Sequence, residues 1–411
     1  MESPGRPPGA FEPRPSFTAD PGLSRYNNRM HSLQNTLADL VRRPSVNPMG
    51  RTDISPDFTF EHRVTDYLER RLLALGCEFQ RQEVEPGRHN LVAYYRPKTP
   101  APFTVLFEAH QDTVPVDAMT VEPFGAKIDG GKMYGRGSCD VKAGITVMLH
   151  AFERLVREKP AGSANVVLAF TVDEEHTFLG VQHLVNSGLK ADYAIVAEPT
   201  LLNIVHAHKG VVRWQIETPG RACHSSRPEQ GVNAVYRMAK VLNAIEIYAE
   251  KLRASANDPL LGPPTLSVGR IMGGVSPNTV PDSCRIDIDR RLIPGEVPAK
   301  AVADLDAFLR SYPGLDVPFV SNPPRLACPP LNPANAGELV ARLGSAIERV
   351  AGKKDVVGVP FGTDASTISE AGIPAVVFGP GDINQAHTKD EWIDLEQLEP
   401  ASEILFRFAA G

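Results

Sequence analysis

The sequence predicts an α/β fold in which a mainly parallel sheet forms one domain and a second, smaller domain is inserted into it. Three observations support this prediction. The chain has 411 residues, more than one hydrophobic core usually holds, which favours two domains. Strand-like and helix-like segments alternate up to residue 207, as in a parallel sheet with crossover helices. The order then changes to βαββαβ, and the alternation resumes after residue 322.

The composition argues against several kinds of partner. A net charge of -6 disfavours nucleic acid and anionic membrane surfaces, because both attract basic proteins. No apolar run approaches the roughly 20 residues of a membrane-spanning helix, and no signal peptide is expected. The 5 cysteines are odd in number and widely spaced, which predicts reduced thiols in a cytoplasmic protein. Since no CxxC pair occurs, any metal would be held by histidines and carboxylates.

The chain divides into four predicted segments. Residues 1–29 are rich in Pro, Gly, Ser and Arg and are predicted to be a disordered leader, because this composition cannot bury a core. The main domain is predicted at 30–207 and 323–411, and the insert at 208–322. Helical periodicity and strand patterns in the main domain predict helices at 31–41, 58–75, 141–158, 336–351 and 395–409 and strands at 78–84, 90–95, 164–172, 193–197, 355–359 and 374–378.

The stretch from Phe103 to Pro115 is central to the main domain. It begins with apolar and β-branched residues, as a buried strand does, and Pro115 ends it by removing a backbone donor. Glu108, His110 and Asp112 lie at the end of this strand. Ligands bind at the carboxyl ends of strands in open α/β sheets, so these side chains are candidate site residues. A hydrogen-bonded histidine at the rim of the core is the alternative.

Acidic residues stand at other strand and helix ends. Asp140 immediately precedes a predicted helix. Glu174 and Glu175 follow one strand, and Glu198 follows the next. Asp140 could be a helix N-cap, and the other acids could form a solvated rim. Carboxylates gathered at one sheet edge would repel one another, however, and a bound cation would remove that conflict.

Glu174 and Glu175 can have different functions because adjacent side chains point in different directions. Glu175 can bind a metal ion while Glu174 serves as a general base. Nitrogen and oxygen ligands in a shared site suit zinc, with cobalt or manganese as substitutes.

The insert is predicted to be a ferredoxin-like domain. Its βαββαβ order comes from elements predicted at 211–217, 231–252, 265–271, 280–292, 298–312 and 317–320. Two of its polar residues are not needed for packing: His224 lies beyond the first strand, and Asn278 lies in a Gly/Pro turn. Turn chemistry alone also explains Asn278. After the insert, His387 follows a Gly-containing turn.

A set of motifs, in their order along the chain, resembles a known family. The motifs are EAHQDTVP, GRGSCD, TVDEE, AEPT, HKG, CHSSRPEQGVNA, GGVSPN, GTDA and GPGDINQAH. With them the chain resembles the M20 family of metal-dependent aminoacylases and peptidases, from about residue 31 to 411. The resemblance implies a zinc-hydrolase catalytic domain with two divalent metal ions, and an inserted dimerisation domain that also acts as a lid.

The resemblance also implies roles for the matching residues. The implied metal ligands are His110 and Glu198 for one ion, Glu175 and His387 for the other, and Asp140 as the bridge between them. Asp112 would orient His110 from behind. Glu174 would be the general base, which takes a proton from the attacking water and returns it to the leaving amine. A cis peptide bond is implied after Asp140.

Further implied roles concern the substrate and a partner subunit. His224 would reach from the inserted domain of a partner chain to bind the oxyanion, so the resemblance implies a homodimer joined through this domain. Asn278 and Arg291 would position the carboxylate of the substrate. Gly362 and Thr363 would line the pocket.

The implied activity is the removal of the acetyl group from N-acetyl-L-ornithine, a step of arginine synthesis. The expected substrate is therefore a small N-acyl amino acid. The same chemistry on succinyl-diaminopimelate, another N-acyl amino acid or a dipeptide is the alternative. A non-catalytic binding protein on the same scaffold is a third hypothesis, which the complete set of ligands and the intact base disfavour.

Overall fold

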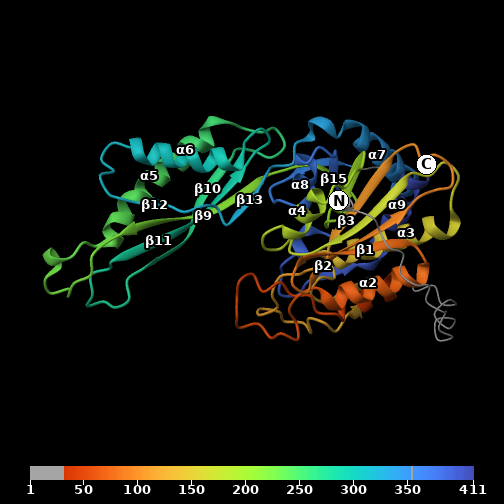
Figure 1. Cartoon of the computed structure of the whole chain (residues 1–411), viewed down its shortest axis with the longest axis horizontal. Helices are drawn as coiled ribbons and strands as arrows, with labels where there is room; N and C mark the ends of the chain where they lie inside the picture. The colour runs from red at the N-terminus through yellow and green to blue at the C-terminus, as the bar shows by residue number, and fades with distance from the viewer. Residues whose placement is uncertain (1–31, 353–354) are drawn as a thin grey trace, which may run out of the picture.

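The structure is a computed structural model that describes residues 32–352 and 355–411. The leader predicted at 1–29 lies outside the described residues. Figure 1 shows two bodies: one is built around a large sheet, and the other is elongated and extends from its side. Within the described part of the chain, no helix is long and apolar enough to cross a membrane.

The large sheet has 8 strands and is mainly parallel at its centre. Its strands are β1 (Glu78–Glu85), β2 (Arg88–Tyr95), β3 (Thr104–His110), β6 (Asn165–Thr171), β7 (Tyr193–Val196), β8 (Ile204–His208), β14 (Val356–Val359) and β15 (Ala375–Val377). Their order is β1-β2-β6-β3-β7-β15-β8-β14. β3 pairs in parallel with β6 and β7, whereas β1 and β2 form an antiparallel edge. The predicted mainly parallel α/β sheet is therefore confirmed.

Helices cover both faces of this sheet. One face packs against α1 (Leu33–Val41), α2 (His62–Leu75), α3 (Lys142–Glu158), α7 (Gly337–Ala351) and α9 (Leu398–Ala410), and the other against α4 (Leu179–Asn186) and α8 (Asp364–Glu370). In β3, Leu106 and Phe107 are both fully buried but belong to the two different cores. Successive strand side chains point to opposite faces, so a strand covered on both faces has an uninterrupted apolar sequence.

Two element boundaries differ from the predictions. The helix predicted from residue 58 begins at His62, because the backbone of Val46 bonds to Phe58 and Phe60 and holds this segment in an isolated parallel bridge. The strand predicted at 317–320 is reduced to β12 (Val320–Ser321), which pairs with only two residues of its neighbour.

The elongated body is the inserted segment (Figure 1). Besides β12 it contains β9 (Gly210–Pro219), α5 (Ala234–Ser255), β10 (Thr265–Gly273), β11 (Ser283–Leu292) and α6 (Pro298–Ser311). The strand order β10-β11-β9-β12 is the ferredoxin-like order that the sequence predicts. β13 (Leu326–Cys328), beyond the predicted boundary at 322, also pairs with β9. Trp214 of β9 packs with α5 and α6, so its neighbour Arg213 lies on the opposite face of this sheet.

A small third sheet joins distant parts of the chain. Its strands are β4 (Lys127–Asp129), β5 (Lys132–Tyr134) and β16 (Trp392–Asp394). β16 is antiparallel to β5, with Trp392 opposite Tyr134. The residues just before β16 therefore lie against the loop that follows β5, and this loop leads to Asp140.

Candidate metal centre and active site

The strand order places three candidate residues at one edge of the large sheet. β6, β3 and β7 are adjacent and parallel, so their carboxyl ends lie side by side. His110 is the last residue of β3, while Glu175 follows β6 and Glu198 follows β7. Side chains far apart in the sequence therefore meet at this edge.

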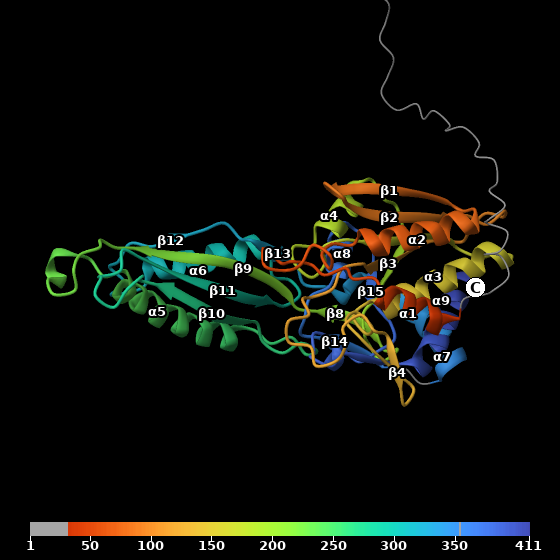
Figure 2. The same ribbon diagram turned by 90° about the horizontal axis from the view of Figure 1, so that it is seen from below.

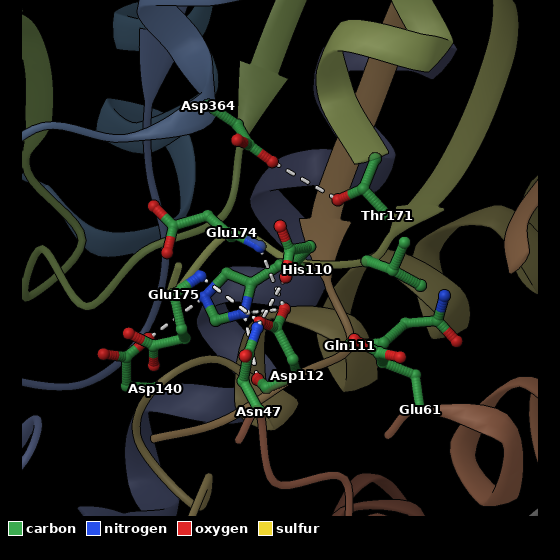
Figure 3. A network of polar contacts seen from close by, with 12 residues as sticks. Asn47, Glu61, His110, Gln111, Asp112, Asp140, Thr171, Glu174, Glu175 and Asp364 are labelled. Carbon is green, nitrogen blue, oxygen red and sulfur yellow. Dashed lines mark hydrogen bonds and ion pairs between the residues drawn. The ribbon is translucent and has the colours of Figure 1, made fainter. Parts of the chain in front are cut away.

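These three residues and two others form two clusters that share an aspartate. The clusters are His110 with Asp140 and Glu198, and Asp140 with Glu175 and His387, and in each the ligand atoms lie within 4.8 Å of one another. Asp140 Oδ1 lies 3.2 Å from His110 Nε2, and Oδ2 lies 3.2 Å from His387 Nε2. Figure 3 shows Asp140 beside Glu175 and His110. Because its two oxygens face different histidines, Asp140 is placed to bridge two ions.

The charges of the clusters favour a bound cation. Burial raises the pKa of the Glu198 carboxyl well above its usual range, and Asp140 raises it further. Hydrogen bonds to Asp140 and Glu175 raise the pKa of His387 to about 11, so the site strongly stabilises a positive charge. Imidazole nitrogens and carboxylate oxygens at this spacing suit zinc, cobalt or manganese. The residues present therefore fit two divalent metal ions.

Asp112 connects His110 to the segment that carries Glu174. His110 Nδ1 lies 3.0 Å from the backbone oxygen of Asp112 and 3.5 Å from its carboxylate. A carbonyl oxygen only accepts, so Nδ1 carries the proton and Nε2 is free to bind a metal ion. The Asp112 carboxylate accepts the backbone N–H groups of Glu174 and Glu175, each at 3.2 Å. One side chain thus fixes the imidazole ring and both glutamates (Figure 3).

Glu174 faces a cavity beside the two clusters. Its side chain is buried, and this burial raises the pKa of its carboxyl well above the usual range. A carboxyl that binds a proton more readily than usual is suited to take one from water and pass it on. The cavity is lined by residues of both bodies, among them Glu174, Glu198, His387, Val211, Arg213 and Arg291.

The inserted domain contributes two arginines to this cavity. Arg213 of β9 and Asp289 of β11 are opposite each other in the strand pair. Asp289 accepts a hydrogen bond from Arg213 Nε at 2.8 Å and another from Arg291 Nε at 2.8 Å. One carboxylate thus faces two guanidinium groups, which leaves one unbalanced positive charge on the side of the cavity that the inserted domain forms. Sequence reasoning identifies Arg291 but misses Arg213, because only the strand pairing shows that both reach one aspartate.

Gly362 and Thr363 have different surroundings. Gly362 lines the cavity. Thr363 is completely buried, and its hydroxyl lies 3.1 Å from His208 Nε2 and accepts the backbone N–H of Ala365. Burial lowers the pKa of His208 to about 4, so its ring is neutral, and its Nδ1–H donates to the Lys209 carbonyl oxygen. The side chain of Thr363 therefore caps α8, and Thr363 is not among the lining residues of the cavity in the described chain.

His224 and Asn278 are separated from the clusters within one chain. His224 lies in the loop after β9, where it pairs with Thr279 in an isolated bridge. Figures 1 and 2 show this loop at the end of the inserted domain that is far from the large sheet. The lining residues of the cavity in the described chain include neither His224 nor Asn278. One chain alone therefore does not bring these two residues to the clusters.

Buried polar and charged side chains behind Asp112 hold its carboxylate and the neighbouring backbone in place. Asn47 Nδ2 donates to the carboxylates of Asp112 at 2.8 Å and Asp173 at 2.9 Å. Arg88 donates to Asp173 at 3.0 Å and forms a bidentate pair with Glu61. Asp173 has a φ of 68°, a left-handed conformation that is unfavourable for a non-glycine residue. The bonds to its side chain hold the backbone in place directly before the glutamate pair. No sequence motif points to Asn47 or Arg88.

The peptide bond between Asp140 and Val141 is cis, as the resemblance implies. The fold and the two clusters together are those of a metal-dependent hydrolase whose candidate ligands lie at the carboxyl edge of a mainly parallel sheet. The chain belongs to the peptidase family M20/M25/M40, whose family model matches residues 106–411.

Individual relatives agree with this membership. The chain is 32% identical over 397 residues to an acetylornithine deacetylase from Myxococcus xanthus, covering 93% of this chain and 98% of the relative. It is 31% identical over 383 residues to an acetylornithine deacetylase from Proteus mirabilis, covering 89% and 93%.

Solved structures show the same fold. An M20 family metallo-carboxypeptidase from Sulfolobus solfataricus is similar with a TM-score of 0.75 and 21% identity, covering 93% of this chain and 99% of that one. A dinuclear metal binding peptidase of the M20 family from Bacillus subtilis has a TM-score of 0.66 and 17% identity, covering 95% and 98%.

Arg88→Met is expected to destabilise the protein by about 3 to 5 kcal/mol, because Glu61 and Asp173 would stay buried without their cation. Urea unfolding followed by circular dichroism measures the change. Arg96→Met is the matched control: Arg96 pairs with Glu78 at the exposed surface and should contribute less than about 1 kcal/mol. Equal stability of the two variants would contradict the supporting role of Arg88.

Proposed function

We propose that this chain is a two-metal amide hydrolase that removes the acetyl group from N-acetyl-L-ornithine and releases ornithine and acetate. The observation that carries this proposal is the sharing of Asp140 between two ligand clusters, with Glu174 in the same cavity. Relatives named acetylornithine deacetylase, at 31% and 32% identity over most of the chain, support the choice of substrate. The proposed role is a cytoplasmic step of arginine synthesis.

The chemistry is divided among the site residues. In this proposal the metal ligands are His110, Asp140, Glu175, Glu198 and His387. Two divalent ions, zinc first and cobalt or manganese as substitutes, would polarise the amide carbonyl and make water more acidic. Glu174 takes the proton from the attacking water and passes it to the leaving amine. Its raised pKa suits both steps, because the same carboxyl must accept the proton and then release it.

The arginine pair supports the binding of a carboxylate-containing substrate. Asp289 balances only one of the charges of Arg213 and Arg291, so this side of the cavity attracts an anionic group. We assign the carboxylate of the amino acid to Arg291, whose planar guanidinium can bind it in a bidentate manner. Gly362 provides part of the cavity wall without a side chain.

Succinyl-diaminopimelate is the second candidate substrate. The specific observation in its favour is Arg213, a second cation in the cavity that could contact a second carboxylate. The same ligands and base would also serve for another N-acyl amino acid or a dipeptide. Direct assay distinguishes these substrates.

Amine release from a panel of amides tests the proposed function. The panel contains N-acetyl-L-ornithine, succinyl-diaminopimelate, N-acetylmethionine and dipeptides, each with and without a chelator. We expect the highest kcat/KM on N-acetyl-L-ornithine, loss of turnover with the chelator, and recovery when Zn²⁺ is added back. A higher kcat/KM on another amide would change the substrate but not the reaction class. Turnover by metal-free protein would contradict the class itself.

Glu174→Gln should keep both metal ions but reduce kcat by about 100 to 10,000 fold, because the amide cannot accept the proton. Metal content measured by elemental analysis separates this effect from loss of the metal centre. Glu122→Gln, at an exposed position outside the cavity, is the control and should behave like the unaltered protein. A Glu174→Gln protein with ordinary turnover would rule out Glu174 as the base.

We further propose a homodimer joined through the inserted domain, in which His224 and Asn278 of each chain reach the cavity of the other. The loops that carry these residues lie far from their own large sheet (Figure 2). Tyr236 is 74% exposed and Val275 is 92% exposed in a surface hollow near these loops, which offers apolar contact area. His224 would then stabilise the oxyanion in the neighbouring chain.

Mixed dimers test this arrangement. His224→Ala and Glu174→Ala proteins should each lose most of their turnover, about 100 to 1000 fold for the oxyanion donor. Co-expressed, differently tagged chains should regain activity, because each mixed dimer has one site with an intact Glu174 and an intact His224 from the partner. Mixed dimers that form but stay inactive would show that His224 does not act across the interface.

A further inference from the structure

Glu391 accepts hydrogen bonds from four donors in the loop that leads to Asp140. Its side chain is completely buried. Oε1 accepts from the backbone N–H groups of Cys139 at 2.9 Å and Asp140 at 3.0 Å. Oε2 accepts from the backbone N–H of Gly137 at 3.0 Å and from Arg136 Nη1 at 2.6 Å. Each carboxylate oxygen therefore has two partners.

The segment that contains Glu391 also contains His387, the histidine of the second cluster. Arg136 Nη2 donates to the backbone oxygen of Thr388 at 3.2 Å. The backbone N–H of Gly135 donates to the backbone oxygen of Glu391 at 3.0 Å. Directly afterwards, β16 begins and pairs with β5. The loop and this segment are therefore linked to each other by contacts that involve no metal ligand side chain.

The two clusters depend on this link to different degrees. In the cluster of Asp140, Glu175 and His387, Asp140 belongs to the loop and His387 belongs to the segment that contains Glu391. In the cluster of His110, Asp140 and Glu198, only Asp140 is held by these contacts, because the other two ligands lie at the ends of strands of the large sheet. The side chain of His387 is 54% exposed and its φ is 60°, so packing contributes little to its position.

We propose that Glu391 is a positioning residue that sets the separation of Asp140 and His387 and thereby determines the metal affinity of their cluster. It acts through the backbone and through Arg136. A carboxylate is required because all four partners are donors. A glutamine would offer one oxygen and one NH₂ group, so in either orientation two buried donors would face another donor.

This inference rests on the two-metal centre proposed above, and the Zn²⁺ stoichiometry of the unaltered protein tests that centre separately. A titration with Zn²⁺ in competition with a chromogenic chelator should show two binding steps. His387→Ala identifies the step that belongs to the second cluster. We expect Glu391→Gln to weaken that step by about 10 to 100 fold, as loss of a residue behind a ligand usually does, with little change in the other step.

Two further measurements make the test specific. The absorption spectrum of the Co²⁺ form reports ligand geometry without relying on turnover, and Glu391→Gln should alter the contribution of the second cluster. Asp390→Asn is the matched control, because it removes the same charge from the exposed neighbouring residue, and it should leave both steps unchanged.

Unchanged affinity at both steps in Glu391→Gln would overturn the proposal, and so would equal weakening of both, which a general loss of structure would cause. If Glu391→Gln does not fold, Arg136→Gln replaces it. This variant removes the guanidinium that donates to Glu391 and to Thr388, and it should weaken the same step in the same direction. Affinities like those of the unaltered protein would then refute the proposal. A single step in the unaltered protein would refute the two-metal centre itself.

Discussion

Repulsion among buried carboxylates at one edge of the large sheet is the constraint on which the other features of the site depend. Asp140, Glu175 and Glu198 converge there with two histidines. Burial raises the pKa of Glu175 and of Glu198, whereas hydrogen bonds from the histidines outweigh burial at Asp140 and hold its pKa below the usual range. Such an edge is stable only with positive charge at its centre. Binding of metal ions and ordering of the edge are therefore coupled.

The groups behind the ligands meet the same constraint with fixed donors. Asp112 is satisfied by Asn47 and by two backbone N–H groups, and Glu391 by three backbone N–H groups and Arg136. Arg88 holds Asp173 in the same way. The carboxylates of Asp112, Asp173 and Glu391 are therefore balanced by donors of the protein itself. These bonds also join segments that are distant in the sequence, so the position of each ligand depends on the whole main domain.

The place of insertion explains how the smaller domain contributes to the cavity. β8 ends at His208 and β9 begins at Gly210, so the chain passes directly from the large sheet into the insert. The base of the antiparallel sheet, with Arg213 and Arg291, is therefore next to the metal edge. The opposite end of the same domain extends far from the large sheet (Figure 1). One end of this domain therefore lines the cavity, and its other end lies far from it.

The sequence by itself determined the mainly parallel sheet, the ferredoxin-like order of the insert, and the residue types at the strand ends, because these depend on local periodicity and on where apolar runs stop. It also pointed to His110 and Glu198, which follow adjacent strands. Only the tertiary structure decided that Arg213 shares Asp289 with Arg291, and that Thr363 caps a helix. Glu391 is the sharpest case. In the sequence it is an ordinary acid near the end of the chain. The role proposed for it depends on the pairing of β16 with β5, which buries it among donors that no local pattern connects to it.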